Sequence, residues 1–502
     1  MESDRIQFEP YKDKIISAAY AASLIQDRDV IGSSGFTKAG DSKAVLPALA
    51  KRALDTPISV TLITGASLGH TTDADLSQNK VLYKRMPFQA DATLRKAINN
   101  HEVLYIDQHL SETAELLHNQ HLPKLNLAIL EAAGIDQNGN LIPTTSIGNS
   151  ATFAALATHI IIEINRTIPL AIGGIHDVFV PKEYPHKEVI GITAVQTRIG
   201  NDYITIDPKK VIGIVFTETP DSPAQLTAPD IKTTAIAGYL MDFFQQEVAS
   251  GRLTKSLLPL QAGIGKVANA VLSGFVNSPF ENLTMYSEVL QDSTFELLDS
   301  GKMSFASASS ITVSEGCYKN FLENLPKYKD KLLLRPQNIS NAAEVIRRLG
   351  IIAINTAIEF DIYGNVNSTH ISGTKMMNGI GGSGDFARNA YLSIFVTQSA
   401  SKENNAISHV LPMVSHVDHT EHDVDILVTD QGLADLRGLA PRERAEAIIA
   451  NCVHPDYRNA LEDYFHRASA QGGHTPHILE EAFSWHTRFS TTGSMQESCL
   501  VE

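Results

Sequence analysis

The chain has little cysteine and no long apolar run. Three cysteines, Cys317, Cys452 and Cys499, are scattered over 502 residues without a CxxC pair, which predicts reduced thiols rather than a disulfide framework. No stretch approaches the roughly 18 consecutive apolar residues of a membrane span, and the acidic N-terminus lacks the apolar core of a secretory signal. We therefore expect a cytoplasmic protein that does not enter the membrane.

Positive charge is also scarce. Lys and Arg number 41 against 56 Asp and Glu, for a net charge of −15. Broad binding to a phosphate backbone needs a cationic surface, so nucleic acid is not an expected partner. No GxSxG elbow supports a serine hydrolase. The histidines between 409 and 422 lack the HExxH spacing of a zinc site, which favours a polar loop over a metal.

Short apolar runs alternate with amphipathic stretches along the chain. Residues 58–67 and 159–165, for example, are typical of buried strands. Strands that alternate with helices in this way predict an α/β fold with largely parallel sheets. A proline-rich stretch separates two halves of similar pattern. We therefore expect two related α/β domains, at 1–219 and 232–502, joined by a linker at 220–231 and separated by a cleft.

Two Gly-rich segments are candidate ligand-binding loops. QAGIGKVANAV at 261–271 follows an apolar run, and Gly263, Gly265 and Ala268 match a GxGxxA dinucleotide fingerprint. The same loop could bind another anion at a helix start, or be an ordinary tight turn. KMMNGIGGSGDFARNA at 375–390 has four glycines in six residues, a density typical of a backbone nest or an oxyanion hole.

A single glutamate is the other candidate. Glu288, in ENLTMYSEVLQD at 281–292, follows the first Gly-rich loop by about twenty residues, where a dinucleotide-binding fold places the acid that holds a ribose hydroxyl. The same carboxylate could be a covalent nucleophile toward an activated acyl group, or an exposed loop residue. The residue pattern leaves these three interpretations open.

Taken in order, these segments resemble the acetyl-CoA hydrolase/transferase family, a branch of the class I CoA-transferases. The resemblance runs over almost the whole chain. YSEVLQD favours the branch that moves CoA between succinyl-CoA and acetate. The segments that carry the resemblance are YIDQHLS, GIGKVANAV, ENLTMYSEVLQD, RPQNISN, NGIGGSGDFARNA and VTDQGLADLRGL.

The resemblance implies two CoA-transferase-type α/β domains with the active site in the cleft between them. Glu288 would be the nucleophile and would carry CoA as a glutamyl-CoA thioester. The backbone N–H groups of Ile264 and Gly382 would bind the oxyanions, and Asn341 would hold Glu288 or the reacting carboxylate. An acetyl-CoA hydrolase that uses the same site is the alternative, because water can take the place of the acceptor carboxylate.

The resemblance also has implications for Asp430, for the expected partners and for the residues that bind CoA. Asp430 stands where relatives commonly have Glu, and its shorter side chain argues against direct contact with the site. Acyl-CoA, succinate and acetate are the expected partners, a homodimer is the expected assembly, and neither a metal nor a prosthetic group is expected, since CoA is the substrate carrier. The CoA-binding residues would be Gly263, Ile264, Gly265, Lys266, Val267, Asn378, Gly382 and Lys402.

Overall fold

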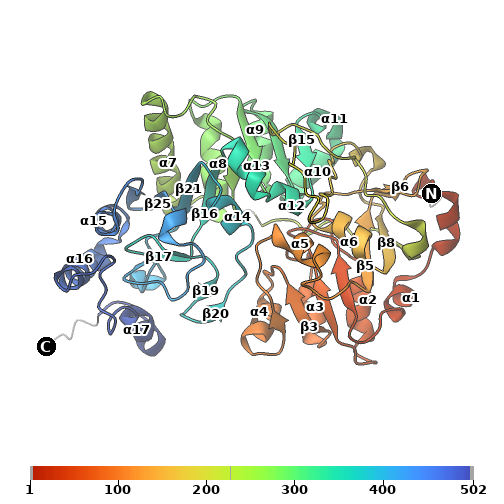
Figure 1. The fold of residues 1–502 in the computed structure, drawn as a ribbon, viewed down its shortest axis with the longest axis horizontal. Helices are drawn as coiled ribbons and strands as arrows, with labels where there is room; N and C mark the ends of the chain where they lie inside the picture. The colour runs from red at the N-terminus through yellow and green to blue at the C-terminus, as the bar shows by residue number, and fades with distance from the viewer. Residues whose placement is uncertain (1–3, 226–227, 498–502) are drawn as a thin grey trace.

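Two β-sheets form the framework of the protein (Figure 1). The computed structural model describes residues 4–225 and 228–497. The first sheet has seven strands, all parallel, in the order β4-β3-β2-β1-β5-β8-β9. Its strands are β1 (Val30–Ser33), β2 (Val60–Ile63), β3 (Leu82–Met86), β4 (Leu104–Tyr105), β5 (Leu127–Ala132), β8 (His159–Asn165) and β9 (Val211–Thr217).

The second sheet has eight strands in the order β15-β13-β11-β10-β16-β21-β25-β26. All neighbours are parallel except the hairpin between β25 and β26. Its strands are β10 (Leu260–Ala262), β11 (Leu283–Tyr286), β13 (Met303–Ala308), β15 (Leu332–Leu334), β16 (Ile352–Thr356), β21 (Leu392–Val396), β25 (Ile426–Thr429) and β26 (Gly432–Asp435).

Both sheets follow the same path. When the strands of each sheet are counted in chain order, both arrangements read 4-3-2-1-5-6-7, and the second adds one antiparallel edge strand. The repeated topology confirms the prediction of two related α/β domains. The predicted strand at 159–165 coincides with β8, all of whose residues except His159 are buried. That burial is expected of a central strand covered on both faces.

Helices cover both sheets (Figure 1). Those of the first domain are α1 (Ala18–Ser23), α2 (Val45–Arg52), α3 (Thr72–Gln78), α4 (Ala92–Asn99), α5 (Glu112–His118) and α6 (Ser150–Leu156). Those after it are α7 (Ile231–Ala249), α8 (Lys266–Gly274), α9 (Asp292–Asp299), α10 (Glu315–Glu323), α11 (Leu325–Tyr328), α12 (Gln337–Ser340), α13 (Ala343–Leu349) and α14 (Ser383–Ala387).

The last three helices, α15 (Pro441–Cys452), α16 (Pro455–Ala470) and α17 (Ser484–Thr492), lie at the end of the molecule near the C-terminus in Figure 1. Their buried faces form a hydrophobic cluster of their own together with β17 (Glu359–Asp361) and β24 (Val410–Leu411). Across 4–225 and 228–497, no helix is both long enough and apolar enough to cross a membrane.

In each sheet the chain reverses its direction of travel once, between β1 and β5 and between β10 and β16. Ligands of open parallel sheets bind beside such a switch point, outside the carboxyl ends of the strands. The loop after β10 begins at Gly263, and Glu288 is the second residue after β11. The topology therefore places the first Gly-rich loop at the switch point of the second sheet, and Glu288 after the neighbouring strand β11.

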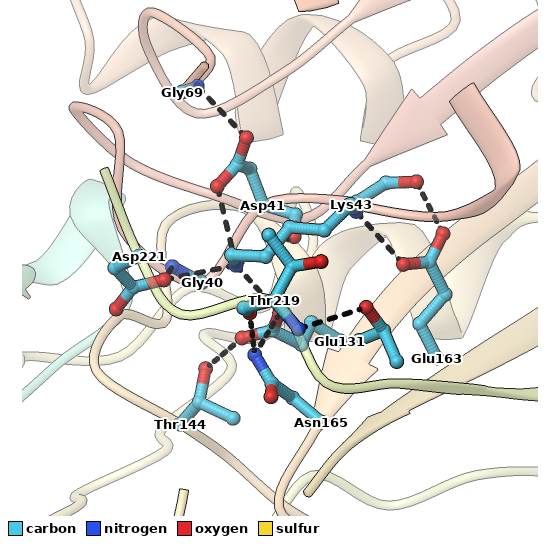
Figure 2. Close-up of polar contacts among 12 residues, drawn as sticks. Gly40, Asp41, Lys43, Gly69, Glu131, Thr144, Glu163, Asn165, Thr219 and Asp221 are labelled. Carbon is cyan, nitrogen blue, oxygen red and sulfur yellow. Dashed lines mark hydrogen bonds and ion pairs between the residues drawn. The ribbon is translucent and has the colours of Figure 1, made fainter. Parts of the chain in front are cut away.

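A buried lysine joins the first domain to the segment between the sheets (Figure 2). The Lys43 side chain is 1% exposed, and its Nζ lies 2.6 Å from Glu131 Oε2 on β5 and 2.9 Å from Asp221 Oδ1. Asp41 Oδ1 is 3.3 Å away. Burial lowers the pKa of Lys43, but the charges of Asp221, Glu131 and Asp41 outweigh burial and hold that pKa well above its usual value.

The same cluster orders the loop that follows β1. Asp221 also accepts a hydrogen bond from the N–H of Gly40 (2.9 Å), and Asp41 accepts one from the N–H of Gly69 (2.8 Å). Glu163 on β8 accepts from the N–H groups of Lys43 (2.8 Å) and Val45 (2.8 Å) and so caps the start of α2. Glu131 on β5, Glu163 on β8 and Asp221 in the segment after β9 thereby hold one loop.

Replacement of Lys43 by Met would leave Asp41, Glu131 and Asp221 buried without a cation. We expect the free energy of unfolding to fall by about 3–5 kcal/mol, the usual cost of removing one partner from a buried ion pair. Urea denaturation followed by circular dichroism measures this change. Lys319→Met is the matched control, since Lys319 is 76% exposed, and we expect a change within about 0.5 kcal/mol there. Equal stability of the two variants would contradict this interpretation.

Candidate active site

Glu288 lines a cavity of about 250 Å³ that residues of both domains enclose. The first domain supplies residues that follow β1, β2, β3 and β4, and the second supplies the loops after β10, β11 and β16 together with 378–383. The carboxyl ends of both sheets therefore face the same space. Among the described residues that line this cavity, Glu288 has the one ionisable side chain.

The wall beside Glu288 is apolar. Phe36, Ala66, Leu110 and Val289 form a separate hydrophobic cluster, and Phe88 packs against it. All five line the cavity, and four of them come from the first domain. Such a wall limits the contact of water with the carboxylate and strengthens any electrostatic interaction inside the cavity.

Asn341 holds the Glu288 carboxylate. Asn341 directly follows α12, is completely buried, and donates a hydrogen bond from Nδ2 to Glu288 Oε1 at 2.8 Å. Burial raises the pKa of Glu288 to about 7, with the Asn341 hydrogen bond opposing this rise and the charge of Asp385 adding to it. A carboxylate with such a pKa is a better nucleophile than an ordinary exposed glutamate when it is ionised.

Gly382 approaches Glu288 more closely than any other residue type could. A Cβ atom at this position would lie 1.6 Å from Glu288 Oε1 and 2.3 Å from Asn341 Nδ2. Within 4–225 and 228–497, no group accepts a hydrogen bond from the backbone N–H of Gly382 or of Ile264. Both residues line the cavity, so both N–H groups are available to a ligand.

A second cavity of about 280 Å³ continues from the first, because Thr37 and Ile264 line both. Gly265 and Lys266 line it at the start of α8. Gly265 has φ of 125°, which favours glycine at this turn. The ammonium group of Lys266 lies 2.8 Å from Asp230 Oδ2 and so pairs with the residue that precedes α7.

Only some of the other predicted binding residues line these cavities. Gly263 and Asn378 line the first one, whereas Val267 is partly buried against the main core. Lys402 extends over the ring of Phe489 at 4.7 Å and lines neither cavity within the described residues. Asp430 accepts hydrogen bonds from the N–H and Oγ of Ser399 (2.6 and 3.1 Å), away from Glu288.

The residues that anchor the second Gly-rich loop to the first domain are not evident from the sequence pattern. The carboxylate of Asp107 accepts a hydrogen bond from the N–H of Ile380 (2.9 Å), and Tyr105 donates to the carbonyl of Asn378 (2.8 Å). Asp385 accepts from the N–H of Ser111 at 3.1 Å and from its Oγ at 2.6 Å. The first-domain partners Tyr105, Asp107 and Ser111 all lie in YIDQHLS, a segment that carries the family resemblance.

The arrangement of two sheets around one cavity is the fold of the CoA-transferases. The chain superposes on a solved 4-hydroxybutyrate CoA-transferase from Porphyromonas gingivalis with a TM-score of 0.63 at 21% identity, covering 91% of this chain and 99% of that one. Residues 1–216 match the acetyl-CoA hydrolase/transferase N-terminal domain, and residues 318–465 match the C-terminal domain of the same family. The chain is therefore an enzyme that belongs to the acetyl-CoA hydrolase/transferase family.

Three relatives from this family carry the names of three different activities. The succinyl-CoA:acetate CoA-transferase of Clostridium kluyveri is 48% identical over 98% of this chain and 92% of its own length. The propanoyl-CoA:succinate CoA transferase of Escherichia coli is 43% identical over 96% of this chain and 98% of its own length. The acetyl-CoA hydrolase of Schizosaccharomyces pombe is 43% identical, with 98% of both chains covered.

Replacement of Gly382 by Ala tests the packing of the site. The added methyl group would force the Glu288 carboxylate to rotate away, and a displacement of about 1 Å can cost about 100-fold in rate. We expect acyl-CoA turnover to fall by about 100-fold while the melting temperature stays within a few degrees. Gly238→Ala in α7 is the control, because a Cβ there meets nothing within 4 Å. Undiminished turnover in Gly382→Ala would refute this account of the site.

Proposed function

We propose that the enzyme transfers CoA between succinyl-CoA and acetate through a glutamyl-CoA thioester on Glu288. The observation that carries the proposal is the position of the Glu288 carboxylate, held by Asn341 at 2.8 Å in a cavity lined by both domains. The 48% identity to the Clostridium kluyveri succinyl-CoA:acetate CoA-transferase supports this acyl pair.

The first half-reaction consists of two exchanges. The Glu288 carboxylate attacks the thioester carbonyl of succinyl-CoA, and CoA leaves as a thiolate from a glutamyl-succinyl anhydride. The thiolate then attacks the Glu288 carbonyl of that anhydride, which releases succinate and leaves CoA on Glu288 as a thioester. No proton is gained or lost overall, and each step exchanges one activated acyl group for another.

The second half-reaction runs the same steps in reverse. Acetate attacks the glutamyl-CoA thioester, the CoA thiolate leaves, and the thiolate attacks the acetyl carbonyl of the new anhydride. Acetyl-CoA departs and the Glu288 carboxylate is restored. Every step passes through a tetrahedral oxyanion. The donors we propose for it are the N–H groups of Ile264 and Gly382, which have no acceptor among the described residues. One such donor is typically worth about 3 kcal/mol.

CoA would reach Glu288 through the second cavity. In this proposal Gly263, Gly265, Lys266 and Val267 contact CoA near the start of α8, whose N–H groups favour an anion. Asn378 would contact it from the second Gly-rich loop. Lys402 would contact it from the hairpin of β22 (Ala400–Ser401) and β23 (Ile407–Ser408). Lys266 would have to exchange its partner Asp230 for the ligand. Asp430, held by Ser399, has no direct part in the reaction.

Hydrolysis of acetyl-CoA at the same site is the alternative, and the fungal relative named acetyl-CoA hydrolase favours it. Water would then attack the anhydride or the thioester in place of acetate. The apolar wall of Phe36, Phe88 and Leu110 opposes the entry of water and supports transfer over hydrolysis. The proposal retains the cytoplasmic location and the homodimer that we expect from the sequence analysis.

Chromatography of CoA esters separates the two activities. After incubation with succinyl-CoA, we expect acetyl-CoA to form only when acetate is added, with total thioester constant. Glu288→Gln should abolish this transfer, and Glu281→Gln, an exposed glutamate just before β11, should retain it. Free CoA that accumulates equally with and without acetate would identify a hydrolase, and transfer by Glu288→Gln would exclude Glu288 as the nucleophile.

The pH dependence follows from the pKa of Glu288. Its pKa is raised from 4.5 to about 7, and only the ionised form attacks the thioester. The value of kcat/KM should therefore rise as pH increases through about 7 and level off above about 8. Initial rates with succinyl-CoA and acetate between about pH 5 and pH 9 measure this profile. An acid limb near the ordinary glutamate pKa would show that the free enzyme does not keep Glu288 in the environment described here.

A further inference from the structure

Asp385 is connected to the Glu288 carboxylate through the side chain of Asn341. It is in the first turn of α14, within the second Gly-rich segment, and is 8% exposed. Its Oδ2 accepts a hydrogen bond from Asn341 Nδ2 at 3.1 Å, the same nitrogen that donates to Glu288 Oε1 at 2.8 Å. The amide of Asn341 therefore bridges two carboxylates, neither of which forms an ion pair with a Lys or Arg of the described residues.

This bridge decides the orientation of the Asn341 amide. The NH₂ group has two hydrogens, and each points to one carboxylate. A flipped amide would bring its oxygen against two anionic groups, which is repulsive. Asn341 Oδ1 has no hydrogen-bond partner among the described residues, so no other hydrogen bond within them orients the amide. Asp385 is the second acceptor that keeps the donor face toward Glu288.

Asp385 is itself held from the other domain. Ser111, at the start of α5, donates both its N–H (3.1 Å) and its Oγ–H (2.6 Å) to the Asp385 carboxylate. A continuous chain of hydrogen bonds thus runs from Ser111 through Asp385 and Asn341 to Glu288. Its first member belongs to the first domain and its other members to the second.

We propose that Asp385 is a positioning residue, which orients Asn341 and through it aims the Glu288 carboxylate when the two domains are in contact. The proposal rests on the function proposed for Glu288. Asp385 touches neither CoA nor the acyl group in this account, since it lines neither cavity within the described residues.

The charges around the bridge give the proposal a signature in the pH profile. Besides burial, the negative charge of Asp385 raises the pKa of Glu288. Burial also raises the pKa of Asp385 to about 6, while Ser111, His109 and Asn341 oppose that rise. In Asp385→Asn the charge is removed, but the amide oxygen of residue 385 still accepts from Asn341, so the hydrogen bond from Asn341 to Glu288 is kept and the pKa of Glu288 should fall. A residue with only a structural role would leave that pKa unchanged.

Asp385→Asn in the full-length enzyme tests the inference. We expect kcat to fall by about 10- to 100-fold, because the amide that holds the nucleophile loses its anionic acceptor. The KM for succinyl-CoA should stay within about twofold of the wild-type value, since no CoA contact changes. The acid limb of kcat/KM should move to lower pH. An unchanged kcat together with an unchanged acid limb would overturn the proposal.

Asp361→Asn is the matched control. Asp361 is also buried, has a pKa raised by burial to about 6, and accepts a hydrogen bond from Asn365 Nδ2 at 3.1 Å, but it lies outside the cavity. It should lose stability without a change in kcat or in the acid limb. If Asp385→Asn does not fold, Ser111→Ala replaces it, because the backbone N–H of residue 111 still reaches Asp385. Ser111→Ala should then lower kcat several-fold at constant KM, and wild-type kcat would overturn the proposal.

Glu288→Gln, measured in parallel, separates this inference from the proposed function. Transfer by Glu288→Gln would overturn both, because no nucleophile would then need positioning. Loss of transfer in Glu288→Gln together with wild-type behaviour of Asp385→Asn would overturn only the role of Asp385.

Discussion

The hydrogen bond from Asn341 to Glu288 is the interaction on which the site depends. A carboxylate beside Phe36, Phe88 and Leu110 has lost much of its hydration and needs a donor that both stabilises and aims it. Asn341 is that donor, delivered by the end of α12, while Glu288 arrives from the end of β11. Because Gly382 has no side chain, the second Gly-rich loop lies directly against Glu288 and Asn341.

This arrangement exists only while the two domains are in contact. Because their carboxyl ends face one cavity, neither domain encloses Glu288 alone. The first domain supplies the apolar wall and also anchors the Gly-rich loop, through Asp107 and Tyr105. The buried Lys43 holds the loop after β1 against the segment between the sheets. This loop carries Phe36 of the apolar wall and Thr37, which lines both cavities. The buried ion pairs of Lys43 therefore help to fix the position of one wall of the active site.

The sequence predicts the fold well because alternation of strands and helices is a local signal, and β8 is found where the pattern indicates. The segments with Glu288, Asn341 and the two Gly-rich loops also come together, as the resemblance implies. The partners of Asp385 and Lys43 could not be predicted. Ser111 and Asp385 are 274 positions apart, and no periodicity distinguishes a lysine buried among carboxylates from one on the surface. Likewise, nothing in the sequence indicates that Lys266 forms an ion pair with Asp230.

The central claim is that Glu288 carries CoA covalently. Mass spectrometry of the enzyme after incubation with succinyl-CoA in the absence of acetate tests it most directly. Our account predicts an added mass equal to CoA minus water, located on the peptide that contains Glu288 and discharged as acetyl-CoA when acetate is supplied. An unmodified chain during active turnover, or CoA attached to a different residue, would contradict it.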